Sequence, residues 1–160
     1  MAAIVSLRDV IDEMEMMSDE ATSYINRKTG ELITITDEMF SLAEDPDEDE
    51  DAPEWQKEFM PKVREVTASE DFIQLPSKFD IHEWSIMERF ARSFTDAAVK
   101  DELQDSLHGA GAFRRFKDAL HRRGIADAWY RYRDAALEEI AIEFLEAQGI
   151  EFRREPSQKR

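Results

Sequence analysis

The sequence predicts an α+β fold that is mainly α-helical, with an N-terminal β-hairpin or small three-stranded antiparallel sheet and about six helices. Apolar residues recur at three- and four-residue spacing through most of the 160-residue chain, which is typical of helices with one buried face. β-branched residues cluster at residues 22–36, on either side of a turn that contains Gly30. We expect a single globular domain over residues 1–152, followed by a disordered tail at 153–160.

The first element is predicted to be a helix, and the hairpin follows it. Ser6 is placed to cap this helix, whose buried side carries Leu7, Val10, Ile11, Met14 and Met17. Residues 22–26 and 31–36 form the strands of the hairpin, and Gly30 can adopt the left-handed conformation of a bulged turn. Thr36 or Asp37 can then cap a short helix that continues through Leu42.

An acidic run divides the N-terminal part of the chain. Glu44–Asp51 has seven acids in eight positions, so we expect a solvated acidic loop at 44–53. Pro53 begins a second helical pattern, which is predicted to be interrupted or kinked near Pro61. Phe72–Leu75 is a short strand candidate that can add to the hairpin and complete a three-stranded sheet.

From Asp80 onward the pattern is helical. Asp80 is the predicted cap of a helix that has Ile81, Trp84, Met87, Ala91 and Phe94 on one face. A helix over about 96–107 is expected to end at His108 and Gly109. The next helix, over about 111–123, is expected to turn Phe113, Phe116 and Leu120 inward and to end at Gly124. The last, over about 126–148, is expected to end at Gly149.

The net charge of −16 is distributed unevenly. Residues 1–60 carry 18 acidic and 4 basic side chains, whereas residues 109–160 carry 9 and 11. The overall balance argues against a protein whose whole surface binds nucleic acid or an anionic membrane. The sequence has no cysteine, so disulfides and cysteine-ligated metals are excluded. With no signal peptide or membrane span evident, we expect a cytoplasmic protein that does not bind membranes.

A basic segment is embedded in this acidic chain. Arg114, Lys117 and His121 recur at i, i+3 and i+7, on the outer side of a predicted helix that follows two glycines. Guanidinium groups and the free amides of a helix N-terminus attract anions. The candidate anion patch comprises Arg114, Arg115, Lys117, His121, Arg122 and Arg131. The alternative is a solvated helix face whose cations pair with carboxylates of the final helix.

Arg133 lies on the apolar face of the final helix, together with Trp129, Ala136 and Ile140. A guanidinium in that setting needs a carboxylate or carbonyl partner, or stacks on an aromatic ring. We predict that Arg133 forms a structural ion pair and is not an active-site residue.

No motif of known catalytic or metal chemistry is complete. The acidic run departs from an EF-hand loop, since Glu50 stands where glycine is needed and Gln56 where a bidentate glutamate is needed. The histidines are scattered, and no Gly-x-Ser-x-Gly elbow is present. We therefore predict no metal and no cofactor. An enzyme whose site is assembled from His82, His108, Glu83 and Arg133 stays an alternative, and it would require a deep pocket.

The C-terminal half resembles a known family. The run His108–Asp118, followed by Ala128–Asp134 and then by Glu143–Leu145 and Gly149, resembles a bacterial family known as uncharacterised protein family 0158. The hairpin residues Tyr24–Glu31 and the stretch Leu75–Phe90 are similar to it too. The resemblance covers most of residues 4–152 and implies one compact bacterial domain, but it implies no activity, substrate or catalytic residue.

Charge and motifs together favour a non-enzymatic interaction or regulatory module that binds a basic protein partner. The acidic N-terminal half would speed encounter with a basic surface and help to select it. The alternative is binding of an anion or nucleic acid through residues 114–133, where Trp129, Tyr130 and Tyr132 would supply stacking surfaces if exposed. The sequence does not indicate the oligomeric state.

Overall fold

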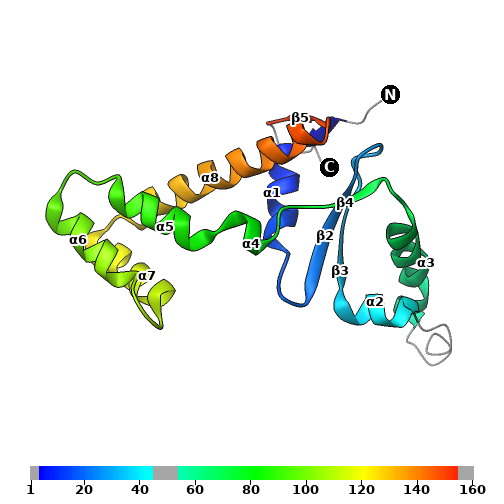
Figure 1. The fold of residues 1–160 in the computed structure, drawn as a ribbon, viewed down its shortest axis with the longest axis horizontal. Helices are drawn as coiled ribbons and strands as arrows, with labels where there is room; N and C mark the ends of the chain where they lie inside the picture. The colour runs from blue at the N-terminus through cyan, green and yellow to red at the C-terminus, as the bar shows by residue number, and fades with distance from the viewer. Residues whose placement is uncertain (1–3, 45–53, 155–160) are drawn as a thin grey trace. The chain divides into compact units, whose positions relative to one another are not determined.

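The computed structural model describes residues 4–44 and 54–154, and it confirms the predicted α+β, mainly helical fold class (Figure 1). The chain divides into two compact units, one formed by Met1–Lys78 with Ala141–Arg160 and the other by Phe79–Ile140. The single domain over 1–152 stays a prediction. Most of the acidic loop and most of the tail lie outside the described residues.

A three-stranded antiparallel sheet organises the first unit, in the order β3-β2-β4. The predicted hairpin is confirmed as β2 (Ala21–Asn26) and β3 (Leu32–Thr36), and Gly30 has a φ of 78° in the turn. The predicted third strand is β4 (Phe72–Gln74), which pairs with the other side of β2. A two-sided pairing of β2 makes it the central strand of the sheet.

Helices cover both faces of this sheet (Figure 1). Helix α1 (Leu7–Glu15) begins at Ser6, whose Oγ accepts a hydrogen bond from the Asp9 amide as predicted. The α1 residue Glu13 accepts a hydrogen bond from Thr34 Oγ1 on β3. On the other face, α2 (Asp37–Glu44) and α3 (Glu54–Ala68) pack against the strands. The core there comprises Ile33, Ile35, Met60, Val63, Val66 and Phe72.

The start of α2 and the proline within α3 can both be compared with the sequence predictions. Thr36 caps α2, because its Oγ1 accepts a hydrogen bond from the Met39 amide at 3.2 Å. Helix α3 continues through Pro61, so it is not interrupted there, and a kink at this proline stays a prediction. A proline inside a helix removes one backbone hydrogen bond, and the buried contacts of Met60 and Val63 on either side of it favour the helix nonetheless.

A second, two-stranded sheet joins the ends of the described chain. Strand β1 (Ile4–Ser6) pairs in parallel with β5 (Glu151–Arg153), in the register Ile4 to Glu151. This pair could not be predicted from the sequence, because each strand has three residues and its partner lies at the opposite end of the chain. β5 includes Arg153, so strand pairing extends into the first residue of the predicted tail.

The second unit is helical and is built around an aromatic cluster. It contains α4 (Lys78–Ile81, from Phe79), α5 (Glu83–Arg92), α6 (Ala97–Ser106), α7 (Ala112–Arg123) and the first part of α8 (Ala126–Ala147). Phe116 is fully buried, and its ring centroid lies 5.1 Å from that of Trp129 and 6.3 Å from that of Phe90. Edge-to-face contacts of this kind stabilise the cluster beyond the area they bury.

The ends of these helices match the sequence patterns with one exception. Asp96, the first residue of the predicted 96–107 helix, caps α6, and α7 ends at Gly124 as expected, with a φ of 66°. The prediction that Asp80 caps a continuous helix is wrong. Asp80 lies inside α4, and the chain breaks at His82, whose φ of 52° is left-handed, before α5 begins at Glu83.

Within the described residues, none of the helices combines the length and the apolar character needed to cross a bilayer.

Candidate functional site

The residues of the candidate anion patch have different local roles. Arg115 turns back onto the loop that precedes α7, where its guanidinium donates hydrogen bonds to the carbonyl oxygens of His108 and Ala110. Gly109 and Gly111 in this loop have φ values of 78° and 76°. Arg115 therefore holds the loop in its tight conformation, and two of its donor nitrogens are engaged there.

Arg122 is paired with a carboxylate of a neighbouring helix. Arg122 and Arg123 both donate to Glu102 on α6, with 3.2 Å between Arg122 Nη2 and Glu102 Oε1. These hydrogen bonds lower the pKa of Glu102, and the bond from Arg123 has a larger effect than the bond from Arg122. The interpretation that the final helix supplies the partner is wrong for Arg122, because its carboxylate comes from α6.

The rest of the patch faces solvent. Arg114, Lys117 and His121 are exposed on α7, and Arg131 is exposed on α8. Among the described residues, no ion pair or side-chain hydrogen bond engages these four. Whether they bind an anion stays a prediction.

Two aromatic side chains that neighbour these cations in the sequence are also exposed. Phe113, expected to point inward, is 51 % exposed, and so is Tyr130. Phe113 belongs to the first turn of α7, next to the loop, so its position on the apolar side of the helix does not place it in the core. Trp129 is buried in the aromatic cluster, and Tyr132 packs against Phe90, so neither ring presents the stacking surface that the sequence analysis considered.

Arg133 meets a carboxylate across the second unit. Its Nε donates to Glu83 Oε1 at 2.7 Å, and the two side chains are 25 % and 40 % exposed. This contact joins the start of α5 to the middle of α8. The geometry is that of a partly buried ion pair, and its contribution to stability stays a prediction.

An acidic surface at one end of the hairpin was missed by the sequence analysis. Strand pairing brings Ala21 opposite Thr36, and the Asp37 amide donates to the Glu20 carbonyl at 2.8 Å. The residues flanking this pair are exposed acids, Asp19 and Glu20 in the turn before β2 and Asp37 and Glu38 in the first turn of α2, which follows β3. We call these four the hairpin-end acids. Their clustering could be found only by combining the strand register with the sequence.

The sequence around the hairpin-end acids is poor in basic residues. The sequence has no lysine or arginine at residues 9–26 or 29–56. Met16, which precedes the strand, is 62 % exposed. Burial and, to a smaller extent, the charge of Asp37 raise the pKa of Tyr24 on β2. The charge of Asp37 therefore acts on the adjoining strand.

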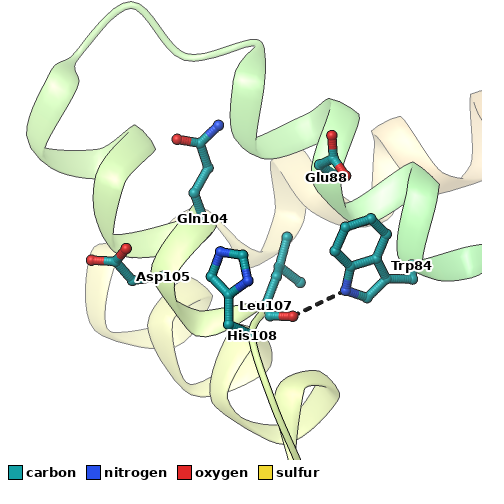
Figure 2. Close-up of a pocket in the computed structure, with 6 residues that line it drawn as sticks. All are labelled: Trp84, Glu88, Gln104, Asp105, Leu107 and His108. Carbon is teal, nitrogen blue, oxygen red and sulfur yellow. Dashed lines mark hydrogen bonds between the residues drawn. The ribbon is translucent and has the colours of Figure 1, made fainter.

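A hollow of about 390 Å³ opens between α5 and α6 (Figure 2). Its lining residues are Trp84, Glu88, Gln104, Asp105, Leu107 and His108. The indole Nε1 of Trp84 donates to the Leu107 carbonyl at 3.0 Å, which fixes the ring in place. We call this feature the α5–α6 hollow. A neighbouring hollow of about 320 Å³ has cations and carboxylates in its lining, including Arg115, Arg122 and Glu102.

The residues of the alternative enzyme site do not converge on one cavity. Arg133 is hydrogen-bonded to Glu83. His108 lines the α5–α6 hollow, whereas His82 and Arg133 are not among its lining residues. In the part of the chain that the structure describes, no three histidine, aspartate or glutamate side chains are grouped so as to hold a metal. The partial EF-hand pattern at residues 45–49 lies outside the described residues.

Fold and surface together define an α+β protein with an acidic hairpin end and a partly paired basic helix. The chain matches the model of an uncharacterised protein family, UPF0158, over residues 2–159, and it belongs to that family. This confirms the resemblance seen in the sequence. No curated protein and no solved structure matches the chain.

Proposed function

We propose that this chain is a non-enzymatic, cytoplasmic module that binds a basic protein partner through the hairpin-end acids. The observation that carries the proposal is the convergence of Asp19, Glu20, Asp37 and Glu38 at one end of the sheet, all four exposed. No ion pair within the described residues neutralises any of the four. Their charges are therefore available to an external cation.

Local structure accounts for only part of this acidity. Asp37 and Glu38 lie in the first turn of α2, where negative charge also favours the helix by interacting with its dipole. Asp19 and Glu20 lie outside any helix, in the turn before β2, and their side chains have no such role. A partner-binding role explains all four positions.

The proposed contact combines steering with an apolar anchor. Unscreened carboxylates on an acidic protein raise the rate of encounter with a basic surface, and this effect weakens as salt is added. Met16, three residues before Asp19 in the sequence, is exposed, and methionine is a flexible side chain that adapts to different binding surfaces. We expect an interface with an apolar centre and a charged rim.

A comparison of two charge-reversed baits tests the proposal. Asp19→Lys with Glu20→Lys removes two hairpin-end acids, while Asp134→Lys with Glu139→Lys changes the net charge equally on exposed positions of α8. We expect the wild-type chain and the α8 variant to retain the same basic protein from a host extract. The hairpin variant should lose it at low and at moderate salt. Equal retention by both variants, or no reproducible partner, would refute the proposal.

A second candidate function is favoured by the exposed basic surface of α7 and α8. Arg114, Lys117, His121 and Arg131 would contact the phosphates of an anionic ligand or nucleic acid, and Phe113 and Tyr130 would supply exposed rings for stacking. Such binding must be strongest at low salt. Charge reversal at Arg114 and Lys117 should abolish the binding of a labelled single-stranded oligonucleotide. Binding that is absent at low salt, or unchanged by this reversal, would exclude this function.

A further inference from the structure

The α5–α6 hollow combines a fixed aromatic wall with negative charge. Trp84 is 40 % exposed, and its only hydrogen-bonding group is already satisfied by the Leu107 carbonyl. A tryptophan held in this way stays accessible for contact with a ligand. The negative face of an indole ring attracts cations more strongly than that of tyrosine or phenylalanine.

The charged groups that line the hollow are both acidic. Glu88 lies one helical turn after Trp84 on α5, and in Figure 2 its side chain stands next to the indole. Asp105 lies on the far rim, on α6. The described lining includes no lysine or arginine.

The existing partner of Glu88 does not close the hollow. Arg92 Nη2 lies 3.2 Å from Glu88 Oε1, one turn further along α5, and the Arg92 side chain is 56 % exposed. Exposed ion pairs at this spacing are weak and are screened by salt. A carboxylate accepts several hydrogen bonds, so Glu88 can bind an additional cation while it keeps Arg92 or in exchange for it.

We propose that the α5–α6 hollow receives an arginine side chain of a basic protein partner. The planar guanidinium would stack flat on the Trp84 ring while its edge donates to the Glu88 carboxylate, a geometry that the compact ammonium of lysine lacks. A volume of about 390 Å³ accommodates such a side chain. This assignment rests on the proposed function for the class of partner, and it adds a second contact, on different residues from the hairpin-end acids.

A titration with a small arginine mimic tests the hollow directly. N-acetyl-arginine methylamide is added to the isotopically labelled full chain, and the indole N–H signal of Trp84, assigned with a Trp84→Phe variant, is followed by NMR. The neutral citrulline analogue, which has the same shape without the charge, is the matched ligand. We expect a saturating shift of the Trp84 signal with the arginine mimic and little change with the citrulline analogue. No shift, or equal shifts with both, would overturn the assignment.

Two variants locate the charge that the mimic contacts. Glu88→Gln should weaken binding of the arginine mimic roughly two- to five-fold, as expected for loss of one partly exposed ion pair. Asp101→Asn is the control, because Asp101 is an exposed acid on α6 that does not line the hollow. Equal effects of the two substitutions would show that only the general negative field attracts the mimic and would refute the assignment.

Failure of this assignment can be told apart from failure of the proposed function. If the hairpin variant loses its partner while the mimic does not shift Trp84, the proposed function stands and the hollow is not its arginine site. If the mimic binds but no partner depends on the hairpin-end acids, the hollow stands and the proposed function fails.

Discussion

The ion pair between Arg133 and Glu83 provides the most quantitative test of the second unit. Arg133→Leu removes the guanidinium whose Nε lies 2.7 Å from Glu83 Oε1 and keeps an apolar side chain at this position of α8. Arg133→Ala also removes the aliphatic stem, which itself covers apolar surface. The alanine variant should therefore be the less stable of the two.

The expected magnitude follows from the exposure of the two side chains. Exposed ion pairs contribute about 0–1 kcal/mol, and breaking a fully buried pair costs about 3–5 kcal/mol. Arg133 is 25 % exposed and Glu83 40 % exposed, between these limits and closer to the exposed one. We expect Arg133→Leu to lower the free energy of unfolding by about 1–2 kcal/mol, a fall in Tm of roughly 2–8 °C.

A double-mutant cycle separates this pair from the other contacts of Arg133. Urea unfolding followed by circular dichroism is measured for Arg133→Leu, Glu83→Gln and the double variant. The double variant should be less destabilised than the sum of the two single variants, because each one already breaks the pair. Strictly additive effects, or an unchanged Tm of Arg133→Leu, would refute the structural role of the pair.

Three other predictions concern the core and two titrating groups. Phe116→Ala should lower the free energy of unfolding by about 3–5 kcal/mol, because Phe116 is fully buried. Phe113→Ala, at a half-exposed position, should change it by less than about 0.5 kcal/mol. Similar urea midpoints for the two variants would contradict the described core. Because Arg123 and Arg122 lower the pKa of Glu102, their stabilising effect is present above the ordinary carboxyl pKa of 4.5 and is lost as the pH falls through the lowered value. Glu102→Gln should thus be less stable than wild type at neutral pH and should approach it as the pH falls through the lowered pKa of Glu102, and a constant difference would be evidence against these bonds. Asp37→Asn should lower the raised pKa of Tyr24 only in part, since burial is the larger cause; spectrophotometric titration that finds no change would exclude the influence of Asp37.

Elements whose signals are local could be predicted from the sequence. Ser6 before an apolar stripe, Gly30 between β-branched runs and Gly124 after the basic helix each act within a few residues, and each has the predicted place in the structure. The third strand was also predicted, because Pro76 limits it and a hairpin alone is marginally stable.

Features that depend on distant residues could not be predicted in this way. The β1 and β5 strands are stabilised by each other, and neither carries a long β pattern. The break at His82 interrupts an apolar periodicity that continues on both sides of it, so the pattern alone indicates one helix. The partner of Arg122 depends on the packing of α6 against α7, which helical spacing does not reveal.

The same distinction applies to the candidate site. Charge counts located the acidic half of the chain, but they did not show that Asp19 and Glu20 lie beside Asp37 and Glu38. Strand register supplies that information. Conversely, the spacing of basic residues was enough to predict the candidate anion patch. It did not show that Arg115 and Arg122 form contacts within the second unit while Arg114 and Lys117 stay exposed.

Carbodiimide cross-linking of the chain to its recovered partner tests the role of the hairpin-end acids most directly, because the reagent joins a carboxylate to a lysine amine without a spacer. Mass spectrometry then identifies the linked residues. We predict cross-links from partner lysines to Asp19, Glu20, Asp37 or Glu38, and their loss as salt screens the complex. Cross-links confined to the acidic run at 44–51 or to the carboxylates of α8 would contradict a hairpin-end interface.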